Sequence, residues 1–287
     1  MCATCGCGQP GMRLVVLAEG AGKPPEHPHQ PEQPHQQQHP HQPEHPHQHQ
    51  HEHEHEHPDD QRHRPAPETI SLERRVLDHN DRLAETNRAW FAEHGLLAVN
   101  LMSSPGSGKT TLLVRTVTDL LPSLGMSVIE GDQETTLDAE RLAATGCPAV
   151  QVNTGSGCHL DAGMIERALG PLCPPAPGVV FIENVGNLVC PGLFDLGERE
   201  RVVITSVTEG ADKPLKYPAM FHSASLVILN KIDLAPYVDF DDAAFARAVS
   251  MVSHHAQVLR LSATTGAGLA AWYEWLQIRV KTQPISP

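Results

Sequence analysis

The sequence predicts an α/β fold with a mainly parallel sheet, preceded by an extension that does not fold on its own. From Leu96 onward, short apolar runs alternate with amphipathic helical stretches, a pattern typical of parallel strands covered on both faces. Residues 24–65, by contrast, contain no Ala, Val, Ile, Leu, Met, Phe, Trp, Tyr or Cys. That segment therefore has no apolar surface to offset the ~1–2 kcal/mol per residue that ordering a backbone costs.

Four segments follow from this division. We expect an N-terminal cysteine motif at residues 1–23, a disordered His/Pro/Gln-rich tract at 24–67, a helix at 68–95 and an α/β domain at 96–287. Ser71 is the expected N-cap of the helix, where apolar residues then recur at near-helical spacing. The strands expected in the domain are residues 97–102, 127–130, 149–152, 179–183, 201–207, 226–230 and 258–261.

Charge and composition exclude several classes of partner. With 21 Lys and Arg against 34 Asp and Glu, the net charge of −13 disfavours binding to nucleic acids or anionic membranes. No run approaches the roughly 18 consecutive apolar residues of a transmembrane helix, and the first residues lack a secretory signal. We therefore expect a cytoplasmic protein with neither kind of partner. In a reducing compartment, an odd count of seven cysteines is more typical of metal ligands or buried thiols than of disulfides.

A glycine-rich loop, Ser103-Ser-Pro-Gly-Ser-Gly-Lys-Thr-Thr111, lies between the first expected strand of the domain and a helix. Its N–H groups and the helix start would bind phosphates, and the residues assigned to this role are Gly106, Ser107, Gly108, Lys109, Thr110 and Thr111. Lys109 would reach the β- and γ-phosphates as a catalytic residue, and the Thr110 hydroxyl would bind Mg²⁺. Ser103 departs from the pattern G-x-x-x-x-G-K-[ST], and the alternative is an ordinary Gly/Ser turn.

Two later strand ends carry a signal for guanine recognition. Asn230-Lys231-Ile-Asp233 follows one apolar strand, and Asp233 could accept two N–H bonds from guanine that adenine does not offer. Ser262 and Ala263 follow the last strand, where a loop could donate to the guanine O6. Together behind the glycine-rich loop, these segments favour GTP over ATP.

Acidic residues at strand ends are candidates for the Mg²⁺ or water network. Glu183 ends one strand, Gly186 follows it and could donate its N–H to the γ-phosphate, and Asp132 ends another strand. We assign Glu183 and Asp132, with Lys109, as catalytic residues. The alternative for either carboxylate is a helix cap or a surface charge.

Three soft ligands, Cys2, Cys5 and Cys7, lie next to the amino terminus. Three thiolates with one nitrogen donor suit Ni²⁺ or Zn²⁺. A redox C-x-x-C is the alternative, but that motif belongs in a βαβ context that this segment lacks. Further along, Cys158-His159 and Cys190 could share one ion, with three unrelated side chains as the alternative. Cys147 and Cys173 show no partner pattern.

The histidine tract predicts weak, multiple metal sites. Thirteen of the 19 histidines lie in residues 27–63, and the alternating run contributes His49, His51, His53, His55 and His57. Imidazole with a pKa near ~6.5 is mostly neutral in the cytosol and free to bind Ni²⁺, Zn²⁺ or Cu²⁺. An expression tag is the alternative, but the Pro, Gln and Glu between the histidines favour a native chelating tract.

Together these motifs resemble the HypB family of hydrogenase nickel-incorporation GTPases, P-loop proteins of the SIMIBI type. The resemblance covers about residues 70–287 and the first eight, and Ser103 matches the family's own form of the loop. The segments that carry it are Cys2-Ala-Thr-Cys5-Gly-Cys7, Ser103-Ser-Pro-Gly-Ser-Gly-Lys-Thr110, Gly155-Ser-Gly-Cys158-His159-Leu-Asp161, Glu183-Asn-Val-Gly-Asn-Leu-Val-Cys190-Pro191 and Lys216-Tyr-Pro-Ala-Met-Phe221 with Asn230-Lys-Ile-Asp233.

The resemblance implies a GTPase that forms a GTP-dependent homodimer. Cys158, His159 and Cys190 would then be a metal site at the subunit boundary, with Ni²⁺ or Zn²⁺ as its ion. The Cys2/Cys5/Cys7 motif would be a tight nickel site, and the histidine tract a nickel store. The implied partners are a HypA-type metallochaperone and the large subunit of [NiFe] hydrogenase.

Two other functions also fit the sequence. One is a urease-type nickel-insertion GTPase resembling UreG, against which the N-terminal cysteines and Cys158-His159 argue. The other is a nickel storage or detoxification protein whose α/β domain serves as a scaffold. Our preferred hypothesis couples GTP to metal through the loop that carries both Glu183 and Cys190.

Overall fold

The computed structural model describes residues 13–17, 67–132, 137–155 and 157–283. They form an eight-stranded sheet in the order β1-β4-β3-β5-β2-β6-β7-β8. Every neighbouring pair is parallel except β1 and β4. The strands are β1 Arg13–Leu17, β2 Leu96–Ser103, β3 Met126–Asp132, β4 Ala149–Asn153, β5 Gly178–Glu183, β6 Glu200–Ser206, β7 Leu226–Asn230 and β8 Gln257–Arg260. The predicted α/β fold with a mainly parallel sheet is confirmed.

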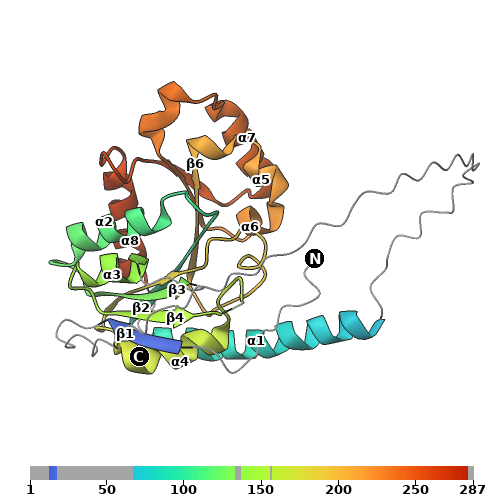
Figure 1. The fold of residues 1–287 in the computed structure, drawn as a ribbon, viewed down its shortest axis with the longest axis vertical. Helices are drawn as coiled ribbons and strands as arrows, with labels where there is room; N and C mark the ends of the chain where they lie inside the picture. Colours follow the sequence, from blue (N-terminus) through green and yellow to red (C-terminus); the bar gives the residue numbers. More distant parts are fainter. Residues whose placement is uncertain (1–12, 18–66, 133–136, 156, 284–287) are drawn as a thin grey trace, which may run out of the picture.

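Helices cover both faces of this sheet (Figure 1). The α-helices are α1 Pro67–Glu93, α2 Lys109–Leu120, α3 Leu137–Ala143, α4 Ala162–Leu172, α5 Lys213–Lys216, α6 Pro218–His222, α7 Asp242–Val252 and α8 Leu269–Lys281. Two 3₁₀ turns, η1 Val207–Glu209 and η2 Ile232–Tyr237, complete the described elements. Helices α2, α3 and α8 pack on one face, and α1, α4 and α5 to α7 lie on the other.

The strands read as continuous apolar runs because both of their faces are buried. In β2, Val99 and Leu101 face the α2 and α8 side, whereas Ala98 and Met102 face the opposite side, and all are at most 1% exposed. Burial on both faces removes the polar alternation that a half-exposed strand would show. All seven expected strands are therefore found, with ends that differ by at most three residues.

Two features of the N-terminal part differ from expectation. β1 was not predicted, and it pairs antiparallel with β4 from Arg13 opposite Asn153 onward. The helix begins at Pro67, so Ser71 lies inside it and is not its N-cap. Proline is favoured in the first turn because it has no N–H to leave unpaired there.

The sheet order brings the candidate site together at one edge. β2 lies between β5 and β6, so the chain turns from one half of the sheet to the other beside the carboxyl end of β2. Such a switch point leaves a crevice outside the strand ends, where ligands bind in open α/β sheets. Among the described residues, no helix combines the length and apolarity that a membrane span requires.

Candidate functional site

The glycine-rich loop forms the floor of a cavity of about 540 Å³ at the carboxyl edge of the sheet. The loop leaves β2 at Ser103 and enters α2 at Lys109, with Gly106 and Gly108 at φ values of 76° and 94°. A side chain at Gly108 would place its Cβ 2.5 Å from Asn230 Nδ2. The loop therefore needs glycine for both its conformation and its packing, and it presents the start of α2 to the cavity.

Three of the predicted side chains meet directly in this cavity. Lys109 Nζ lies 2.6 Å from Glu183 Oε1, and the Thr110 hydroxyl donates to the same oxygen at 2.6 Å. Glu183 is 1% exposed, and its Oε2 has no hydrogen-bond partner within the described part of the chain. A buried carboxylate oxygen beside a threonine hydroxyl is a donor set that fits Mg²⁺, which prefers oxygen ligands.

Two further residues that the sequence predicts for the phosphate site line the same cavity. Asp132 ends β3, and Gly186 follows β5, and both line the cavity. A Cβ at Gly186 would come within 3.3 Å of the Pro105 backbone, so the loop after β5 packs closely on the glycine-rich loop. A displacement of either loop would therefore require the other loop to move as well.

The candidate base-recognition segments are joined by Asn230. Its side-chain amide donates to Ser107 O at 2.9 Å and accepts from Ala263 N at 3.0 Å. Lys231, at a φ of 60°, extends its Nζ to Gly106 O at 2.6 Å. Asn230 is thus a structural link between the phosphate loop and the loop after β8, and Lys231 belongs to the same link.

Asp233 and Ser262 lie beyond this link. Asp233 is half-buried in η2, while Ser262 is fully buried and its Oγ accepts from Thr265 N at 3.1 Å. Neither lines the phosphate cavity as the structure describes it. Their role in base recognition therefore stays a prediction from the sequence.

Three residues of the pocket escaped the sequence analysis. Asp138 Oδ2 lies 2.9 Å from the Thr110 hydroxyl oxygen, as a second possible acceptor beside Glu183, and Asp138 Oδ1 pairs with Arg141 at 3.0 Å. Glu130 lies in β3 opposite Glu183 of β5. Burial, followed by the negative charges of Glu183 and Asp132, raises the pKa of Glu130 to about 8. An acidic residue inside an apolar strand was the available signal for Glu130, whereas nothing local marked Asp138 or Arg141.

Cys158, His159 and Cys190 form a second group of candidate ligands, in this case for a metal ion. Cys158 Sγ lies 3.0 Å from Cys190 Sγ and 3.6 Å from His159 Nδ1, and the ligand atoms of all three lie within 4.8 Å of one another. The ring of His159 packs on Phe194 at a centroid distance of 4.0 Å. Burial lowers the pKa of His159, although Asp161 opposes that shift, so the imidazole is neutral and able to bind a metal at neutral pH.

The loop between β5 and β6 connects the two groups. Glu183 at its start contacts Lys109 and Thr110, and Cys190 is seven residues later. Asn184 Oδ1 accepts from Leu160 N at 3.2 Å, which ties this loop to the segment carrying Cys158 and His159. Nucleotide and metal candidates therefore share one continuous segment.

The other predicted metal ligands lie outside the described residues. They are Cys2, Cys5, Cys7, His49, His51, His53, His55 and His57. The first described residue, Arg13, pairs with Asn153, so β1 begins at the edge of the sheet that carries the pocket. Cys147 is buried in the core, where burial raises its pKa to about 12, and Cys173 is exposed at the end of α4. Neither joins the cysteine–histidine group.

Comparison with known proteins agrees with this geometry. Residues 97–260 match the family described as CobW/HypB/UreG, nucleotide-binding domain. The hydrogenase maturation factor HypB of Escherichia coli K12 is 55% identical over 208 residues, which cover 72% of each chain.

Two solved structures are similar over most of the domain. HypB from Archaeoglobus fulgidus superposes with a TM-score of 0.67 at 39% identity, covering 71% of this chain and 100% of that one. HypB from Helicobacter pylori in complex with nickel has a TM-score of 0.67 at 35% identity, covering 73% and 99%. With its phosphate loop, its acidic pocket and its linked cysteine–histidine group, the chain belongs to the HypB family of hydrogenase maturation factors.

Proposed function

We propose that the protein is a GTP-hydrolysing nickel metallochaperone that stores Ni²⁺ and delivers it to the large subunit of [NiFe] hydrogenase. The observation that carries this proposal is the single loop running from Glu183 in the nucleotide pocket to Cys190 in the cysteine–histidine group. The HypB structure from Helicobacter pylori, which is in complex with nickel, adds support for the choice of metal.

In this proposal, GTP occupies the cavity with its phosphates on residues 106–111. Asp233 and the loop of Ser262 and Ala263 select the guanine base. Mg²⁺ would be held by Thr110 and Glu183, where it would neutralise developing charge on the phosphates. Lys109 orients the β- and γ-phosphates, and Asp132 and Glu183 position the attacking water, which gives GDP and phosphate.

Cys158, His159 and Cys190 bind the nickel cargo, with Zn²⁺ as the other ion that suits this donor set. Val189 and Leu193 flank Cys190 and are 58% and 57% exposed. Exposed apolar side chains around a metal site favour burial against a second copy. We therefore place the metal at the interface of a GTP-dependent homodimer in the cytoplasm, with a HypA-type metallochaperone as a further partner.

Complementation of a strain that lacks this maturation factor tests the function. The parent chain should restore hydrogenase activity at limiting nickel, whereas Lys109→Ala and Cys158→Ser/Cys190→Ser should not. Asp239→Asn, an exposed substitution outside both groups, is the matched control. Full activity with both site variants at limiting nickel would contradict the proposal and favour a store whose GTPase domain serves as a scaffold.

A further inference from the structure

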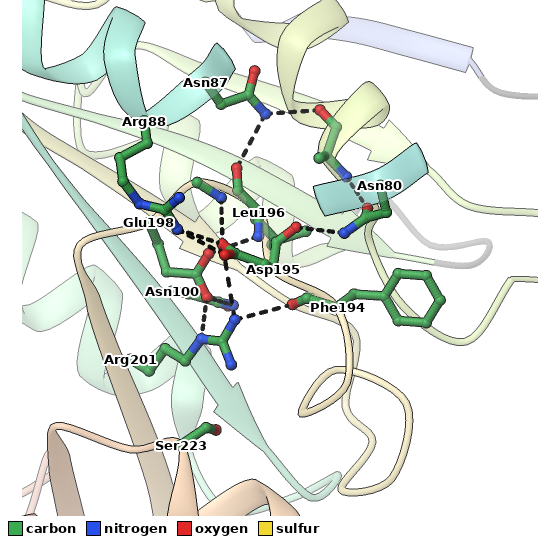
Figure 2. Close-up of polar contacts among 12 residues, drawn as sticks. Asn80, Asn87, Arg88, Asn100, Phe194, Asp195, Leu196, Glu198, Arg201 and Ser223 are labelled. Atoms are coloured by element: carbon green, nitrogen blue, oxygen red, sulfur yellow. Dashed lines mark hydrogen bonds and ion pairs between the residues drawn. The ribbon is translucent and has the colours of Figure 1, made fainter. Parts of the chain in front are cut away.

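Helix α1 meets the loop that carries Cys190 through three polar side chains (Figure 2). Asn80 Nδ2 donates to Asp195 O at 2.8 Å, and Asn87 Nδ2 donates to Leu196 O at 3.0 Å. One nitrogen of the Arg88 guanidinium pairs with both oxygens of the Asp195 carboxylate, at 2.8 and 2.7 Å. The helix thus holds the chain five to six residues after Cys190.

The same two asparagines also hold the segment that follows His159. Ala162 N donates to Asn80 Oδ1 at 2.9 Å, and Asn87 Nδ2 donates to Ala162 O at 2.8 Å. Ala162 begins α4, three residues after His159. Each asparagine is therefore a bridge between the two chain segments that supply the metal ligands.

Burial makes these bridges costly to break. Asn80 and Asn87 are 5% and 1% exposed, so water is not available to replace a lost partner. Leaving a buried N–H or carbonyl unpaired costs about 1–3 kcal/mol. The side-chain amides of Asn80 and Asn87 therefore hold the two segments at a fixed separation.

A second set of bridges joins the same two segments without involving α1. Leu160 N donates to Asn184 Oδ1 at 3.2 Å, and Asn187 Nδ2 donates to Cys158 O at 3.3 Å. The ring of Phe194, the residue directly before Asp195, packs on His159. Loss of the α1 bridges would remove the bonds to Asp195, Leu196 and Ala162, while the bonds of Asn184 and Asn187 remained.

We propose that Asn80 and Asn87 are positioning residues of the cysteine–histidine metal site. They set the distance between the segment of Cys158 and His159 and the segment of Cys190, so α1 controls how tightly the site holds its ion. This inference rests on the proposed function for the identity of the ligands. Groups that hydrogen-bond directly to metal ligands typically contribute 10- to 100-fold to affinity, and because Asn80 and Asn87 act through the backbone beside the ligands, we expect the lower end of that range.

Two measurements on the full chain test the proposal. In metal-free protein, the rate at which diamide joins Cys158 to Cys190, followed by peptide mass spectrometry, reports how often the two thiols meet. Ni²⁺ is also titrated into each variant and into the same variant carrying Cys158→Ser/Cys190→Ser. The binding that is lost with the two cysteines gives the Ni²⁺ affinity of the site. Asn80→Leu and Asn87→Leu should each slow the thiol reaction severalfold and lower the Ni²⁺ affinity about tenfold.

Thr116→Val is the matched control. Thr116 is a buried polar residue of α2 that accepts from Trp272 Nε1 at 2.8 Å, on the other face of the sheet. The control should leave both readouts at the parent values. If it lowers them as much as Asn80→Leu does, or if both asparagine variants stay within about twofold of the parent, the proposal is overturned.

The two readouts also separate this inference from the proposed function. If the parent and its Cys158→Ser/Cys190→Ser version bind Ni²⁺ equally, the metal assignment is wrong, and the thiol rate alone then decides whether the asparagines position the two segments. If Asn80→Leu does not fold, Asn87→Leu carries the test. An unchanged thiol rate in that variant overturns the proposal.

Discussion

The nucleotide pocket and the cysteine–histidine group lie at the same edge of the sheet but are built differently. The pocket is a contiguous loop on a strand end, and it is fixed by the sheet, by Asn230 and by the start of α2. The candidate metal ligands Cys158 and Cys190 lie on two loops, 32 residues apart in the chain, and side-chain bridges from Asn80, Asn87 and Asn184 join these loops.

This difference assigns different roles to the two regions. The pocket is fixed by the backbone hydrogen bonds of the sheet, whereas the separation of the two loops rests on a few buried side-chain bonds, so a change in those bonds alone would alter it. Glu183 is anchored in the first region and Cys190 in the second. We therefore propose that a change at the phosphates moves Cys190, a candidate metal ligand, without disturbing the sheet.

Lys109→Ala should impair the nucleotide pocket strongly while leaving the cysteine–histidine group unaffected. Lys109 faces the phosphate cavity and makes no described contact with the cysteine–histidine group. Its loss should lower the rate of GTP hydrolysis on the order of 10²-fold or more, because a preorganised positive group is removed. The Ni²⁺ affinity of nucleotide-free protein should be unchanged, as measured by titration. A tenfold change there would show that the regions are not built independently.

Asp233→Asn should change base preference and leave phosphate binding intact. The carboxylate is expected to accept two N–H groups from guanine, so its loss should weaken GTP binding about 10- to 100-fold. An asparagine amide can instead donate to the O2 of xanthine, so xanthosine triphosphate should gain affinity. Competition binding measures both changes, with Asp239→Asn, an exposed neighbour, as the control. Equal loss for every nucleotide would count against a role in base selection.

Glu130→Gln should alter the pH dependence of stability in nucleotide- and metal-free protein. The pKa of Glu130 is raised to about 8 in the folded state, so between its ordinary value and pH 8 the unfolded chain has released a proton that the folded chain retains. Stability conferred by this group therefore falls as pH rises.

Glutamine does not titrate, so the free energy of unfolding of Glu130→Gln relative to that of the parent should rise by about 1 kcal/mol or more between pH 5 and pH 8. Urea unfolding at both pH values measures this difference. A constant difference across that range would mean that Glu130 is already ionised in the folded protein.

Arg88→Ala should have a smaller effect than the other variants, because Arg88 forms an exposed bridge whereas Asn80 and Asn87 form buried ones. Burial alone would raise the pKa of Asp195, but hydrogen bonds from Arg88 and from Gly197 N–H outweigh it, and the net shift is downward. Because the Arg88 side chain is 46% exposed, its loss should cost about 1 kcal/mol or less at neutral pH.

The cost should vanish as pH falls through the lowered pKa of Asp195, since the folded carboxyl then protonates. Ni²⁺ affinity should change less than about twofold, in contrast to the buried asparagines. Unfolding and Ni²⁺ titration experiments on Arg88→Ala and Asn80→Leu measure both effects. Equal losses of Ni²⁺ affinity in the two variants would contradict a special role for the buried bridges.

The core of the fold was predictable because its strands are buried on both faces. Continuous apolar runs such as residues 97–102 and 179–183 can be recognised as strands without knowing which strands they pair with. β1 is different: five residues, Arg13–Leu17, become a strand only by pairing with β4, more than 130 residues away. A long-range pairing of that kind leaves no periodicity of its own to detect.

The site was predictable where its residues follow a local rule and not where they act through tertiary packing. Lys109, Asp132, Glu183 and the segment of Asn230 stand at strand ends or in a glycine-rich loop. Asp138 and Arg141 reach the pocket from α3 through side chains alone. Asn80 and Asn87 look like ordinary polar positions of an exposed helix, and their role becomes visible only once two distant loops lie against them.

We propose that nucleotide state controls metal binding through the loop from Glu183 to Cys190. The most direct test titrates Ni²⁺ into the full chain with GDP and with a non-hydrolysable GTP analogue, beside the Cys158→Ser/Cys190→Ser variant. We expect the affinity of the parent to differ between the two nucleotides and that difference to disappear in the variant. A parent chain whose Ni²⁺ affinity is the same with both nucleotides would contradict the claim.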